Sequence, residues 1–190
     1  MRRPAAPTWW PSTVVVLALL LGASGCSGGD EEASRRAATE AVDREVARNS
    51  LAGMFAGDQP DAQGRAEGRC FADRLLDEVT PEDLQEHGVL DEDHGPAAGH
   101  GSLPEELATP WAEAQLACVS FYEASTRAQR AATKGRLDEA AYRSCLEAAV
   151  DEAEAVAGTA AALRGDWDDR ALEELSRAQS SCASETAPQR

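Results

Sequence analysis

Four cysteines spread between residues 70 and 182 constrain the fold more than any other feature. They are Cys70, Cys118, Cys145 and Cys182, and a fifth cysteine, Cys26, lies far upstream. No two of them form a CxxC motif, which argues against a dithiol redox site and against a zinc ribbon. An even set of four in an exported chain predicts two disulfides, which can be paired in three ways.

Helix geometry selects among these pairings. The segments around Cys145 and Cys182 have helical apolar patterns, and a turn at residues 164–166 separates them. Positions in an antiparallel hairpin lie level when they are equidistant from the turn, and this pair is centred at 163.5. The midpoint of Cys118 and Cys145 lies at 131.5, several residues before the turn near Gly135. These two cysteines would therefore be out of level by about 10 Å. A disulfide needs Cα atoms within about 7 Å. We therefore predict Cys145–Cys182 and, by elimination, Cys70–Cys118.

The apolar pattern predicts helices along the whole body of the chain. The expected helices cover residues 30–56, 66–79, 81–87, 110–134, 137–163 and 167–182. No run alternates polar and apolar residues, so no sheet is expected. We predict an all-α fold, a small antiparallel helical bundle with two disulfides that follows a signal peptide and a flexible tether.

Capping residues predict where several helices begin. Thr80 is expected to cap the short third helix, with Pro81 as its first residue and Gly88 as the left-handed residue at its end. The Thr-Pro pair recurs at residues 109–110 and predicts the start of the first long helix. Further expected starts are Ser102, with Glu105 three residues later, and Asp166.

The N-terminal segment has the layout of a secretory signal peptide. A cationic head at residues 1–3 precedes an apolar run at residues 14–21 and four small residues before Cys26. The apolar run is too short for a transmembrane helix, which needs about 20 apolar residues.

The segment Ala23-Ser24-Gly25-Cys26 resembles the lipobox of bacterial lipoproteins, although Ala23 occupies the position where leucine is commonest. The resemblance implies that Cys26 carries a diacylglyceryl group and that residues 1–25 are removed. It also implies attachment to the extracytoplasmic face of the cell membrane. In layout the chain is similar to small, helical, cysteine-paired lipoproteins of actinobacteria that have no assigned activity.

The expected organisation is a signal peptide at 1–25, a lipidated cysteine with a flexible tether at 26–35, a helical domain at 36–183 and a disordered tail at 184–190. Removing residues 1–25 leaves 165 residues with 16 basic and 34 acidic side chains, a formal net charge of −18. Such a charge argues against nucleic acid as a partner, because phosphates require basic patches. The expected partners are the membrane, through the lipid, and a protein of the envelope.

A histidine-rich loop offers an alternative function. Imidazoles and carboxylates gather between residues 87 and 100, and both groups bind zinc and other divalent metals. The candidate ligands are His87, Asp91, Asp93, His94 and His100. The spacing matches neither HExxH nor an EF-hand loop, and a solvated acidic loop is the simpler interpretation. The alternative is therefore a metal- or solute-binding lipoprotein.

Catalysis has no support in the sequence. The expected helical domain contains no GxSxG and no SxxK motif, and every cysteine is assigned to lipid or to a disulfide. We expect no enzyme activity and no cofactor. Trp111 and Trp167 are expected to plug the core at helix ends, and an exposed one would be the natural centre of a partner site. The expected role is a binding or scaffolding module at the envelope.

Overall fold

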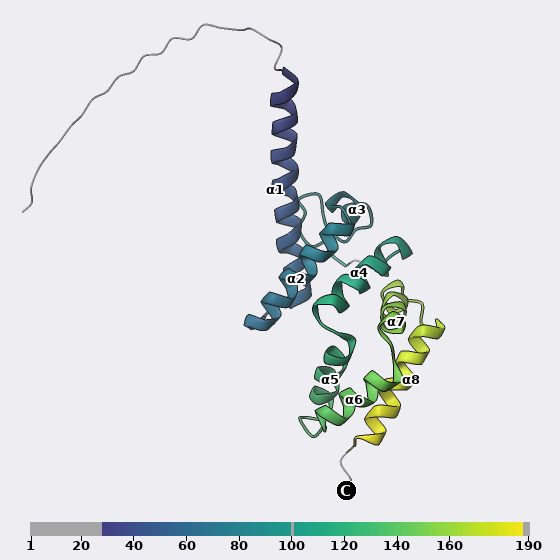
Figure 1. Cartoon of the computed structure of the whole chain (residues 1–190). Coiled ribbons are helices and arrows are strands. Elements are labelled where there is room, and N and C mark those ends of the chain that lie inside the picture. The colour runs from purple at the N-terminus through teal and green to yellow at the C-terminus, as the bar shows by residue number, and fades with distance from the viewer. Residues whose placement is uncertain (1–27, 100, 188–190) are drawn as a thin grey trace, which may run out of the picture.

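The computed structural model describes residues 28–99 and 101–187. Every regular secondary-structure element assigned in these ranges is an α-helix (Figure 1). An isolated β-bridge joins Leu90 to Pro96. The prediction of an all-α bundle with two disulfides is confirmed. The helices are α1 (Gly28–Ala56), α2 (Ala62–Glu78), α3 (Pro81–Glu86), α4 (Glu105–Cys118), α5 (Phe121–Ala132), α6 (Glu139–Ala149), α7 (Glu152–Arg164) and α8 (Arg170–Glu185). The predicted signal peptide and Cys26 lie outside the described residues.

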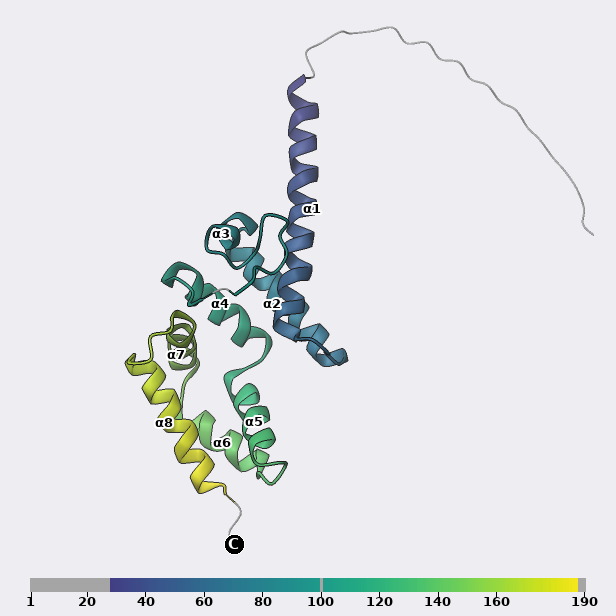
Figure 2. The same ribbon diagram turned by 180° about the vertical axis from the view of Figure 1, so that it is seen from behind.

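Helix α1 is unusual because only its C-terminal half packs on the body. Residues 31–42 are all exposed, and this half extends away from the other helices in both views (Figures 1 and 2). The flexible tether expected over 26–35 is therefore wrong for residues 28–35, which are helical. Alanine and arginine favour the helix here, and Arg35 pairs with Glu31 one turn earlier at 3.6 Å.

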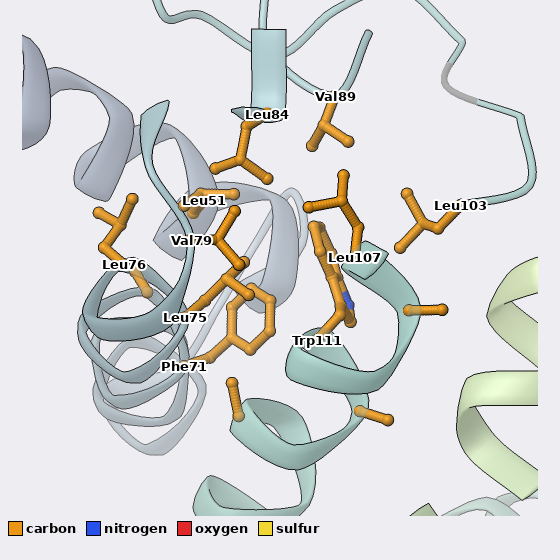
Figure 3. Close-up of a cluster of buried hydrophobic side chains, with 14 of the residues drawn as sticks. Leu51, Phe71, Leu75, Leu76, Val79, Leu84, Val89, Leu103, Leu107 and Trp111 are labelled. Atoms are coloured by element: carbon orange, nitrogen blue, oxygen red, sulfur yellow. The ribbon is translucent and has the colours of Figure 1, made fainter. Parts of the chain in front are cut away.

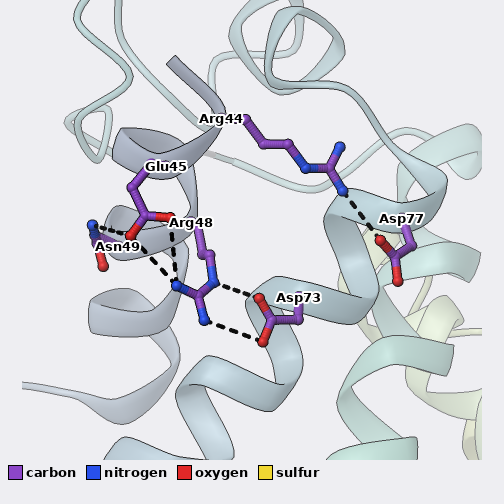
Figure 4. Close-up of polar contacts among 6 residues, drawn as sticks. All are labelled: Arg44, Glu45, Arg48, Asn49, Asp73 and Asp77. Carbon is purple, nitrogen blue, oxygen red and sulfur yellow. Dashed lines mark hydrogen bonds and ion pairs between the residues drawn. The ribbon is translucent and has the colours of Figure 1, made fainter. Parts of the chain in front are cut away.

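Helices α1 and α2 approach each other closely. Gly68 of α2 has no side chain to hold the backbones apart, and its Cα faces the carbonyl of Ala52 in α1. Two arginines of α1 reach across to aspartates of α2 (Figure 4): Arg48 with Asp73, and Arg44 with Asp77 at 3.1 Å. These exposed pairs add little stability each, so the buried contact fixes the two helices.

A first hydrophobic cluster joins α1, α2, α3 and α4 (Figure 3). Phe71 lies at its centre, with its ring 4.6 Å from that of Phe55 and 4.9 Å from that of Trp111. A second cluster joins α5, α6, α7 and α8, and its largest buried members are Phe121, Tyr142, Leu146 and Leu175.

The two disulfides have the predicted pairing. Cys70–Cys118 joins α2 to α4 with Cα atoms 5.8 Å apart, and Cys145–Cys182 joins α6 to α8 at 5.6 Å. Each bond therefore links two helices that meet at one of the two hydrophobic clusters.

Each of the two long predicted helices is interrupted. The expected helix over 110–134 breaks after Cys118, where the Ser120 hydroxyl accepts a hydrogen bond from the amide of Glu123 and caps α5. The expected helix over 137–163 breaks after Ala149, where Asp151 and Glu154 form a capping box for α7. At both breaks a side chain offers the backbone an alternative to a continuous helix.

Several predicted helix ends need correction. Helix α4 starts at Glu105 with Pro104 as its N-cap, so Ser102 caps nothing there and Pro110 lies inside the helix. Asp169, not Asp166, caps α8 by accepting the amide of Ala171. The tail expected from 184 is wrong for residues 184 and 185, which belong to α8, and the Thr186 hydroxyl donates a hydrogen bond to the carbonyl of Cys182 at the end of this helix. The predicted start at Thr80 is right, with Asp83 completing a capping box.

Candidate functional site

The histidine loop places its imidazoles against acids of different helices. His94 has a side chain only 12% exposed; its Nδ1 lies 3.0 Å from the amide nitrogen of Gln85 and its Nε2 lies 3.8 Å from Asp43 of α1. His87 instead places Nε2 3.7 Å from Glu106 of α4. The third histidine of the predicted set, His100, lies outside the described residues. The described imidazoles therefore do not converge on one point.

The acids of this loop shape its backbone. Asp91 Oδ1 accepts hydrogen bonds from the amides of Asp93 at 3.0 Å and Gly95 at 2.7 Å. Within residues 28–99 and 101–187, no group of three or more histidines, cysteines or acids is arranged to hold a metal ion. Asp91 thus acts in the described loop as a turn former, and Asp93 is exposed.

A hollow of about 360 Å³ lies where the two helix breaks meet. The phenol of Tyr122, at the start of α5, donates a hydrogen bond of 2.8 Å to the carbonyl of Val150, between α6 and α7. Burial and then the negative charges of neighbouring acids, Glu152 foremost, raise the pKa of this phenol. Leu116, Phe121 and Val156 supply apolar walls. The sequence did not predict this hollow, because the helices expected over 110–134 and 137–163 were both continuous.

The two tryptophans of the body have opposite environments. Trp111 is buried in the first cluster, as predicted. Trp167 is 72% exposed, so the expectation that it plugs the core is wrong. It lies in the turn between α7 and α8, where Gly165 adopts a left-handed conformation with φ of 71°. Since α8 begins only at Arg170, Trp167 precedes the helix that was expected to bury it.

A second hollow of about 440 Å³ adjoins Trp167. Loop residues 101–103 form one side, and the amide of Leu103 donates a hydrogen bond of 2.8 Å to the carbonyl of Leu163 in α7. We call this region the Trp167 surface: Trp167, its exposed neighbours Asp166 and Asp168, and the adjoining wall of Ser102, Leu103, Trp111 and Leu163.

The charges around the Trp167 surface are mainly acidic. Arg164 lies 3.5 Å from Asp169 and 4.0 Å from Asp166, and is shared between them. No ion pair joins Asp168 to another described residue. An exposed indole whose two neighbours in the chain are aspartates can engage a cation through the ring face and through those acids.

No helix in the described ranges is long and apolar enough to cross a membrane. Comparison of the chain with family models, curated proteins and solved structures gives no match.

Proposed function

We propose that the protein is an extracytoplasmic lipoprotein, held on the cell membrane by lipid on Cys26, that works as a binding or scaffolding module without catalysis. The observation that carries this proposal is the segment Ala23-Ser24-Gly25-Cys26 directly after a short apolar run. A diacylglyceryl group supplies two acyl chains, enough for stable anchoring.

The disulfides support an extracytoplasmic location. Cys70–Cys118 and Cys145–Cys182 use all the cysteines downstream of Cys26. Disulfides persist in oxidising compartments and are rare in the cytosol. Cys26 is left as the odd cysteine, which agrees with a separate use of its thiol.

Helix α1 suits a module displayed on a surface. It begins two residues after Cys26, and its exposed part, residues 31–42, spans about 18 Å at 1.5 Å per residue. A helix of this length would hold the body clear of the membrane while the lipid stays inserted. The chain charge favours the same arrangement, because the acidic body is repelled by anionic lipid.

The geometry favours a partner surface over the rival metal site. The described histidines each face a different acid, whereas Trp167 presents a large apolar side chain to solvent. Exposed aromatic residues beside an apolar hollow are typical centres of protein recognition. A solute in the hollow near Tyr122 is the second candidate, since its volume falls within the usual range for small ligands.

Metabolic labelling with an alkyne fatty acid tests the anchor. In an actinobacterial host, the wild-type chain and Ser27→Ala are expected to incorporate label and fractionate with membranes. Cys26→Ala is expected to lose both properties, because the thiol is the acceptor. External protease should digest the body of the anchored protein on intact protoplasts. Label retained by Cys26→Ala, or no label in the wild type, would contradict the proposal.

A further inference from the structure

We infer that the Trp167 surface docks a basic protein segment, one that carries an arginine or lysine next to an apolar side chain. The cation would lie over the indole and near Asp168, and the apolar side chain would enter the adjoining hollow. This inference deepens the proposed function by naming the kind of partner, and it rests on the binding role but not on the lipid.

Trp167 is exceptional among the aromatic residues. All other aromatic side chains in the described ranges are buried or half-buried, whereas Trp167 is 72% exposed. Tryptophan is enriched among the residues that dominate binding energy at interfaces, especially beside pockets that exclude water. The open hollow of about 440 Å³ beside it, with Leu103, Trp111 and Leu163 on its wall, gives an apolar side chain of a partner a place to pack.

The turn holds Trp167 in place before any partner arrives. The amide of Asp166 donates to the carbonyl of Ala161 at 3.0 Å, and the amide of Asp169 donates to the carbonyl of Asp166 at 3.3 Å. Asp169 also caps α8 through the amide of Ala171 at 2.8 Å. Hydrogen bonds therefore fix the backbone on both sides of the indole, which lowers the entropic cost of binding.

Charge selects the occupant. Asp166 and Asp168 flank Trp167 in the sequence, and the segment from Asp151 to Glu185 carries nine acids against three arginines. A basic segment is attracted to this end of the molecule, and the face of tryptophan is the best aromatic partner for a cation. A second copy of this chain would bring the same excess of negative charge, and an anionic membrane surface would be repelled as well.

Selection from a displayed library of random dodecapeptides tests the inference. The bait is the full chain carrying Cys26→Ser, so that no lipid contributes. Enriched peptides are expected to combine arginine or lysine with an apolar residue. Their affinity should fall about 30-fold or more in Trp167→Ala and about two- to fivefold in Asp168→Asn. The affinity of these peptides should also weaken as the salt concentration rises from about 50 to about 500 mM, because salt screens the attraction between opposite charges. Val42→Ala, at another exposed apolar residue, is the matched control and should bind as the parent does.

Three results would overturn the inference. The first is a library that yields no peptide above the background of a blank surface. The second is a set of enriched peptides that lack basic residues, or peptides that bind the Trp167→Ala variant as tightly as the parent when the circular dichroism spectrum of the variant matches that of the parent. The third uses vesicles of phosphatidylcholine with or without phosphatidylglycerol: binding that falls in Trp167→Ala would assign this surface to lipid instead. Failure of lipid labelling at Cys26 would leave all these measurements unaffected, so the two proposals can fail separately.

Discussion

Replacing Gly68 by alanine tests the close contact between α1 and α2. A methyl group at this position would clash with the carbonyl oxygen of Ala52 and would lie 3.2 Å from the Cβ atom of Ala56. Both obstacles belong to α1, and the first is backbone, which cannot rotate away as a side chain can. The helices must therefore separate or bend to admit the methyl group.

The size of the effect follows from two opposing terms. Alanine improves the helix propensity of this α2 position by about 1 kcal/mol, and overpacking a tight contact costs about 1–3 kcal/mol. Because the clash is with backbone, we take the upper end of that range and expect a net loss of about 2 kcal/mol. Gly53, in α1, is the matched control, because a Cβ atom there meets nothing within 4 Å. Gly53→Ala should therefore stabilise the fold by about 0.5–1 kcal/mol.

Thermal and urea unfolding followed by circular dichroism measure both variants, with the disulfides kept intact. A change of 1 kcal/mol shifts Tm by about 2–4 °C in a domain of this size. We expect Gly68→Ala to lower Tm by about 4–8 °C and Gly53→Ala to raise it by about 1–4 °C. Equal or greater stability of Gly68→Ala relative to Gly53→Ala would refute the close packing of α1 on α2.

Three further predictions concern other contacts. Replacing both cysteines of the disulfide between α6 and α8 by alanine should cost about 4 kcal/mol, the chain-entropy value for its separation of 37 residues, measured by urea unfolding. A hydrogen bond from Arg127, opposed by burial, lowers the pKa of Glu67 below its ordinary 4.5. The interaction of Glu67 with Arg127 therefore stabilises the fold above pH 4.5, and this stabilisation is lost as the pH falls through the lowered pKa. In Glu67→Gln the urea midpoint should depend less on pH over that acid range. An unchanged pH dependence would refute the contribution of this pair. Trp111→Ala should cost about 3–5 kcal/mol and Trp167→Ala less than about 0.5 kcal/mol, and equal losses in thermal melts would contradict their different burial.

The sequence predicted best those features that short-range signals control. Thr80 caps α3, Pro81 is its first residue, and Gly88 has the expected positive φ of 66°. The amide of Val89 then bonds the carbonyl of Leu84, which closes the end of the helix. Each of these interactions joins residues at most five positions apart, so composition and spacing suffice to predict them.

Features that depend on packing were predicted less well. Pro110 signals a helix start, yet α4 begins five residues earlier because burial of Leu107 and Ala108 outweighs the hydrogen bond that proline removes. Trp167 has the large apolar side chain that is typical of a core residue. The turn after Gly165 continues to Asp169, however, and leaves this side chain exposed to solvent. The Trp167 surface could not be predicted for the same reason, since its hollow joins segments some 60 positions apart in sequence.

The disulfide pairing was predicted correctly although the two breaks in the long helices were not predicted, and the position of the breaks explains why. Antiparallel packing of α7 on α8 about the turn at Gly165 is real, and α6 continues along α8 beyond the break at Val150. The interruption changes the direction of the chain without moving Cys145 away from the level of Cys182, so counting residues from the turn still pairs them. The hydrogen bond from Tyr122 to Val150 shows that this break meets the one between α4 and α5. The described core is therefore divided into two clusters, and α7 contributes Ala160 to the first and Ala155 to the second. One disulfide joins α2 to α4 at the first cluster and one joins α6 to α8 at the second, so each half of the described core carries its own covalent cross-link.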